Sequence, residues 1–125
     1  MSQASLILLS PAATADHLTA AMQQAPDGER LLILPPHLHD RSGNEPALKI
    51  DRTNPGLRLQ LIDGAIAALR PSLLIADLVA AGEVIPTLSR HPGLKSAILL
   101  LDGSEKRKLL REQARHFQHS ELVRV

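Results

Sequence analysis

Ser72-Leu-Leu-Ile-Ala-Asp77 is a short apolar run that ends on an acidic residue. A strand with one solvated face would alternate apolar and polar residues, so this run predicts a strand buried on both faces of a parallel sheet. Runs of the same kind recur along the chain at Ser5–Ser10, Leu31–Leu34, Ala97–Leu101 and Glu121–Val125. The sequence therefore predicts five parallel strands.

The segments between these runs have the length and spacing of helices, as parallel crossovers require. Ser10 is a typical N-cap residue and Pro11 a typical first residue of a helix, so a helix is predicted to begin there. Apolar residues recur at helical spacing over Leu61–Leu69, which predicts another helix. Asp102-Gly103-Ser104 predicts a turn and cap before a last helix over 104–119. We expect one α/β domain over residues 1–125, a three-layer, doubly wound sheet of five parallel strands, Rossmann-like or flavodoxin-like.

Composition excludes several classes of protein. The chain has 125 residues, with 14 Lys and Arg against 13 Asp and Glu, and it has no Cys. Without cysteine there are no disulfides, thiolate zinc sites or thiol nucleophiles, and this fits a reducing cytoplasm, where we expect the protein to reside. The opening residues do not resemble a signal peptide, and no run approaches the roughly 18 apolar residues of a membrane span.

The longest irregular connection is predicted from His37 to Gly56, where the composition turns polar. Long loops in compact domains are usually functional or disordered, so this loop is a candidate contact surface. In an extended segment, His37 and His39 would project to one side and could share a metal ion, although solvated histidines explain the pattern better. We expect no metal here, and we take His37, His39, Asp40 and Arg41 as candidate ligand or partner contacts.

In open parallel sheets ligands sit beyond the carboxyl ends of the strands, which here carry Asp77 and Asp102. Such an aspartate can bind a metal, accept a phosphoryl group or hold a ribose, but it is also a common cap. A capping or turn role is favoured for Asp102, whereas the alternatives for Asp77 are evenly balanced. We place both on the candidate surface and expect no cofactor.

Other motifs argue against specific chemistry. The turn Ser10-Pro-Ala-Ala13 has no glycine, unlike a phosphate-binding loop, and the chain has no Gly-x-Ser-x-Gly elbow. The predicted helix over 104–119 has a basic outer face that could contact phosphates. Without aromatic residues among its cations or a net basic chain, a solvated face is the better interpretation, and nucleic-acid binding ranks last.

Two family resemblances extend this interpretation. Leu31-Leu-Ile-Leu-Pro-Pro36, Arg58 at the opening of a helix, Leu69–Asp77, Gly82-Glu83 and the strand ending at Asp102 resemble the first half of predicted bacterial glycosyltransferases of the GT-B fold. In that family this half mainly binds the acceptor, which adds Gly82 and Glu83 to the candidate surface. The family's glycine-histidine loop, its Pro-Phe-Gly segment and its nucleotide-binding half have no counterpart in this sequence.

Arg70–Leu78 is similar to the third strand of response-regulator receiver domains, which implies that Asp77 is the phosphorylated residue. Receivers also use an acidic pair after the first strand, a Ser or Thr where Asp102 stands, and a later lysine. This chain has Ser10-Pro11 in the place of the acidic pair. The resemblance therefore implies a pseudo-receiver.

From these observations we expect a non-catalytic Rossmann-like domain that acts as a regulatory or protein-interaction module. The alternative is the acceptor-binding half of a split GT-B glycosyltransferase, completed by a partner chain. A protein partner is expected and a membrane is not, while homo-oligomerisation is left open.

Overall fold

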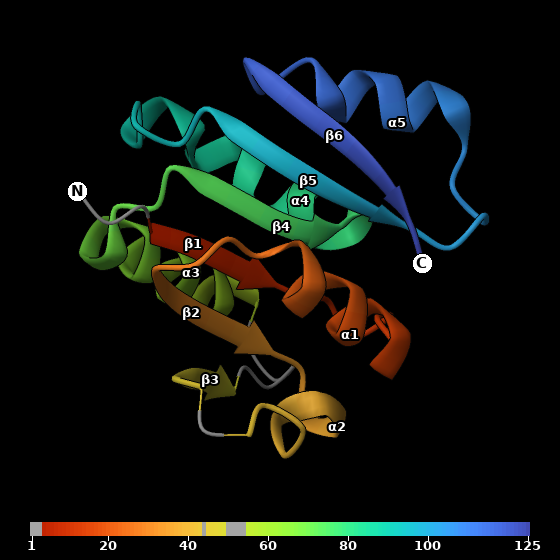
Figure 1. Cartoon of the computed structure of the whole chain (residues 1–125). Helices are drawn as coiled ribbons and strands as arrows, with labels where there is room; N and C mark the ends of the chain where they lie inside the picture. The colour runs from red at the N-terminus through yellow and green to blue at the C-terminus, as the bar shows by residue number, and fades with distance from the viewer. Residues whose placement is uncertain (1–3, 44, 50–54) are drawn as a thin grey trace.

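The computed structural model describes residues 4–43, 45–49 and 55–125, and these form a single sheet of parallel strands flanked by helices (Figure 1). The strands lie in the order β3-β2-β1-β4-β5-β6. Their bounds are β1 (Ala4–Leu8), β2 (Glu29–Leu34), β3 (Ala47–Lys49), β4 (Leu73–Asp77), β5 (Ser96–Leu101) and β6 (His119–Arg124). The helices are α1 (Ala15–Gln24), α2 (Pro36–His39), α3 (Pro55–Leu69), α4 (Leu78–Val84), the 3-10 helix η1 (Ile85–Arg90) and α5 (Arg107–Ala114).

The parallel α/β architecture is confirmed, but the sheet has six strands instead of five. The additional strand is β3, whose Ala47 and Leu48 are in register with Leu32 and Ile33 of β2. It was missed because it is three residues long and lies in a polar segment. The segment from His37 to Gly56 is thus not wholly irregular, since it includes most of α2, all of β3 and the first two residues of α3. Its residues 44 and 50–54 lie outside the described ranges.

The sheet separates two apolar clusters. Alternate residues of each inner strand point to opposite faces, so Leu74 and Leu99 belong to one cluster and Ile75 and Leu100 to the other. Helices α3, α4 and α5 contribute to the first cluster, and α1 and α2 contribute to the second. In Figure 1, α3 passes behind β1 and β2. This three-layer packing explains why the inner strands are continuous apolar runs.

Three boundaries differ from the sequence prediction. Helix α1 begins at Ala15 with Thr14 as its N-cap, instead of beginning at Pro11 after Ser10. Helix α5 covers only Arg107–Ala114 with Lys106 as its N-cap, because a hydrogen-bonded turn at Asp102–Glu105 precedes it and a second turn over 115–118 leads into β6. Strand β6 is not buried on both faces: among the described strands it pairs only with β5, and most of its residues are exposed.

The strand order places a topological switch point between β1 and β4. From this pair, the chain builds the sheet toward β3 on one side and toward β6 on the other, so the helices that follow β1 and β4 cover opposite faces. The carboxyl ends of the two strands lead to Ser10 and Asp77. Within the described ranges, no helix is long and apolar enough to cross a membrane.

Candidate functional site

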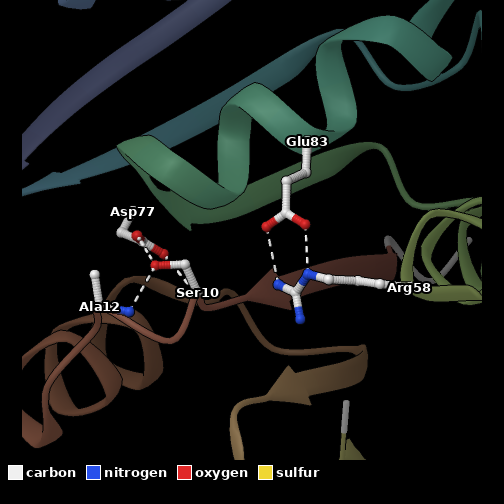
Figure 2. A network of polar contacts seen from close by, with 5 residues as sticks. All are labelled: Ser10, Ala12, Arg58, Asp77 and Glu83. Atoms are coloured by element: carbon white, nitrogen blue, oxygen red, sulfur yellow. Dashed lines mark hydrogen bonds and ion pairs between the residues drawn. The ribbon is translucent and has the colours of Figure 1, made fainter. Parts of the chain in front are cut away.

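The carboxyl ends of β1 and β4 are joined by hydrogen bonds between Ser10 and Asp77, which we call the Ser10–Asp77 latch. The Ser10 main-chain N–H donates to Asp77 Oδ1 at 2.8 Å, and the Ser10 hydroxyl donates to Asp77 Oδ2 at 2.6 Å. Both residues are buried. Asp77 occupies the N-cap position of α4, yet its side chain makes no capping hydrogen bond, because both oxygens are turned toward Ser10. Figure 2 shows the latch from close by.

The remaining main-chain donors of the β1–α1 turn are also used within the chain. Ala12 N–H donates to Ser10 Oγ at 3.2 Å, and Ala13 N–H donates to the Ser10 carbonyl at 3.0 Å. Thr14 N–H donates to His17 Nδ1 at 3.0 Å, and Pro11 has no N–H. A phosphate held by this turn would need such N–H groups directed outward. From Ser10 to Thr14, each of them already has an acceptor within the chain.

In accepting the main-chain N–H of Thr14, His17 takes the place of the Glu or Gln side chain of a capping box. Because the main-chain N–H of Thr14 can only donate, Nδ1 of His17 is the acceptor, and the neutral ring carries its proton on Nε2. The side chain is buried, and it lines a hollow at the carboxyl edge of the sheet.

That hollow has a volume of about 390 Å³ and lies beside the latch, between the starts of α4 and α5. Val79 and Leu109 line it and are exposed, whereas Leu78 is buried. Gln113 also lines it, and its Oε1 atom is buried without a hydrogen-bond partner. The polar residues around the hollow are His17, Asp77, Asp102, Ser104, Glu105, Lys106 and Gln113.

Asp102 has the turn role that its sequence context predicted. Its Oδ1 accepts from the hydroxyl and, at 2.8 Å, from the main-chain N–H of Ser104, and these bonds lower the pKa of Asp102 to about 2. Glu105 completes the turn by accepting from the main-chain N–H groups of Asp102 and Gly103, each at 3.0 Å. The predicted turn is correct, whereas the cap of the next helix is Lys106. Asp102 therefore places a negative charge on the exposed edge.

Arg58 and Glu83, both part of the glycosyltransferase resemblance, form a bidentate ion pair between α3 and α4 (Figure 2). Arg58 Nη2 donates to Glu83 Oε1 at 2.9 Å, and Arg58 Nε donates to Oε2. The side chains are only 10% and 22% exposed. This pair connects two helices on the same face of the sheet. Gly82, beside Glu83, lies where a Cβ would come within 3.0 Å of Gln113 Nε2, so it permits close approach of α5.

The histidines of the polar segment lie on a helix and not on an extended chain. His37 and His39 fall within α2, where residues two apart do not share a face, so the geometry predicted for a shared ion is wrong. His37 Nε2 is 2.7 Å from the carbonyl oxygen of Ala13, which links α2 to the β1–α1 turn. Asp40 and Arg41 follow α2 and are exposed. In the described part of the chain, no group of three His, Asp or Glu side chains could hold a metal.

The structure thus divides the eight candidate residues among several places. Asp77 and Asp102 line one hollow, Gly82 and Glu83 lie in α4, and His37, His39, Asp40 and Arg41 belong to α2 and its end. Sequence reasoning missed His17 and the partner of Asp77. The spacing of Thr14 and His17 was the available signal for the former, since it matches a capping box.

No protein-family model matches the chain, no curated protein matches it, and no solved structure matches it.

Proposed function

We propose that this chain is a non-catalytic Rossmann-like α/β domain that acts as a regulatory or protein-interaction module. The observation that carries the proposal is the internal use of every main-chain N–H from Ser10 to Thr14, together with the Ser10–Asp77 latch. Doubly wound domains that bind nucleotides use this turn to hold phosphate. Here a phosphate would have to displace existing hydrogen bonds.

The exposed residues of the carboxyl edge support protein contacts. Val79 and Leu109 are 58% and 45% exposed beside the hollow, and charged side chains at Asp102 and Lys106 surround them. Exposed aliphatic residues with a charged rim are typical of protein-binding surfaces. The exposed Asp40 and Arg41 lie after another strand end of the same edge, so the proposed surface runs from α2 past the start of α4 to the start of α5.

The second candidate is the acceptor-binding half of a split GT-B glycosyltransferase. The observation that favours it is the Arg58–Glu83 ion pair, because it joins residues from two separate parts of the resemblance. In this account a partner chain supplies the sugar-nucleotide site, and the isolated chain has no turnover. The pseudo-receiver form of our proposal requires that Asp77 stay unphosphorylated, which agrees with its burial and its two hydrogen bonds to Ser10.

The proposal is tested by recovering the partner and mapping its contact. We expect affinity capture with the intact chain from its native host, read by mass spectrometry, to recover a protein that binds again after purification. Hydrogen exchange of the complex should then show protection at 36–43, 78–82 and 102–109. A partner chain that restores glycosyl transfer would favour the second candidate. Protection confined to the basic helix α5 would contradict the proposal and favour a nucleic acid or an acidic partner.

A further inference from the structure

Two polar side chains that line the hollow beside the latch have hydrogen-bonding atoms without a partner in the described part of the chain. His17 is 4% exposed, and its Nδ1 accepts from Thr14, so the proton on Nε2 is left as a donor. None of the described residues accepts from this Nε2–H. Gln113 has the opposite need, because its Oε1 is buried and no described group donates to it.

Unpartnered polar atoms of this kind are uncommon in a native fold. A polar atom that is buried without a partner loses its hydration and gains nothing in return, so most such atoms are paired with protein or with water, and the exceptions call for an explanation. Within the described ranges, the other enclosed side-chain atom without a partner is Ser5 Oγ, and Ser5 does not line the hollow. One donor and one acceptor are therefore left on the walls of the same hollow.

The packing of α4 against α5 keeps the Gln113 amide in place. Its Nε2 lies so close to Gly82 that a Cβ on that glycine would stand 3.0 Å away. Leu78, Val79 and Leu109 add apolar surface to the same hollow. Its volume of about 390 Å³ lies in the range of about 300–1,000 Å³ that is typical of sites for small molecules. Such sites combine apolar walls with a few fixed polar groups, as this hollow does.

The charges around the hollow favour an uncharged ligand. Three carboxylates line it, those of Asp77, Asp102 and Glu105, against the single ammonium of Lys106. An anion would be repelled by this excess of negative charge. A group with donors alone, such as an ammonium, would leave the Nε2–H of His17 without an acceptor. The complementary group is therefore neutral and carries both a donor and an acceptor.

We propose that the hollow binds a small uncharged molecule through a carboxamide or lactam group. In such a group a carbonyl oxygen and an N–H stand on adjacent atoms. The oxygen accepts from His17 Nε2–H, the N–H donates to Gln113 Oε1, and the apolar remainder of the molecule contacts Val79 and Leu109. A ketone would leave Gln113 Oε1 unpaired. This inference goes beyond the proposed function, because it concerns a small molecule and not a protein partner.

Titration of the purified chain with three probes of similar shape tests the site. Benzamide, acetophenone and benzoate each have a phenyl ring on a carbonyl carbon, but only benzamide is a neutral molecule with an N–H. We expect benzamide to shift the NMR signals of the His17 ring and the Gln113 side-chain amide saturably, with a dissociation constant on the order of 1 mM. Acetophenone and benzoate should bind at least about tenfold more weakly.

The variant Gln113→Met tests which atom accepts from the benzamide N–H. It keeps a side chain of similar length and removes the oxygen that lacks a donor, so it should unfold at the same urea concentration as wild type or at a higher one. It should also bind benzamide and acetophenone equally. Gln23→Met is the matched control, because Gln23 is an exposed residue of α1 outside the hollow, and it should keep the preference for benzamide.

Three results would each overturn the inference. The first is the absence of a saturable shift in the wild-type chain at benzamide concentrations on the order of 10 mM. The second is equal binding of benzamide and acetophenone to wild type, and the third is a preference for benzamide that persists in Gln113→Met. Because these experiments use only the purified chain, each of these results would leave the proposed protein partner untouched.

Discussion

Leu74→Asp and Leu99→Asp are each expected to unfold the protein. Both leucines are fully buried, in β4 and β5, and both belong to the cluster between the sheet and helices α3 to α5. An isolated carboxylate in that position loses its hydration without gaining a partner, at a cost of several kcal/mol, which is a large part of the stability of a small domain. Circular dichroism and urea titration of each variant measure this loss.

Leu122→Asp is the control for the same substitution in an exposed strand. Because β6 has only one neighbouring strand and Leu122 is half exposed, we expect a change within about 0.5 kcal/mol of wild type. If Leu74→Asp or Leu99→Asp were as mild as this control, the assignment of β4 and β5 to the interior of a parallel sheet would be wrong.

Glu83→Ala is expected to destabilise the protein by about 3 kcal/mol. The variant removes the carboxylate but leaves the guanidinium of Arg58 buried beneath α3 without its bidentate partner. The penalty comes from this uncompensated charge more than from the loss of the attraction itself. Urea titration gives the free energy of unfolding directly.

Two comparisons make this prediction specific. The Arg30–Glu45 pair has the same residue types, and Glu45 is about as exposed as Glu83, but Arg30 is 24% exposed where Arg58 is 10%. The guanidinium that Glu45→Ala leaves behind can therefore be hydrated, and this change should cost at most about 1 kcal/mol. The double variant Arg58→Met with Glu83→Leu replaces the ion pair by apolar contact and should recover most of the lost stability. Equal costs for Glu83→Ala and Glu45→Ala would contradict a buried role for the Arg58–Glu83 pair.

The inner sheet could be predicted from sequence because burial on both faces leaves a continuous apolar run, as Leu73–Asp77 and Ser96–Leu101 show. Strand β3 could not, since a three-residue edge strand needs little apolar character and is specified by its pairing with β2. Strand β6 differs in the opposite way: its last residues read as a buried apolar run, but at the edge of the sheet Leu122 is 49% exposed, and Val123 and Val125 are only partly buried against the second cluster.

The candidate site was predictable only in part. That Asp77 ends a strand follows from its position in the run, but its hydrogen bonds to Ser10 join residues 67 apart in sequence. They depend on β1 and β4 being neighbours, and local patterns do not determine strand order. The same applies to Arg58 and Glu83, whose pairing depends on how α3 packs against α4. The role of Asp102 in a turn was easier to predict from the sequence, since its partner Ser104 belongs to the same turn.

The central claim, that the β1–α1 turn is closed to phosphate, is tested most directly by following its amides during a titration. Inorganic phosphate, ADP and a UDP-sugar, each with magnesium, are added to the nitrogen-15-labelled chain, and the signals of Ser10, Ala12, Ala13 and Thr14 are recorded. Our account predicts no saturable shift of these four amides, because each is already donating within the chain. Saturable shifts of these amides with a dissociation constant of roughly 10 μM or tighter would contradict it and identify a nucleotide site.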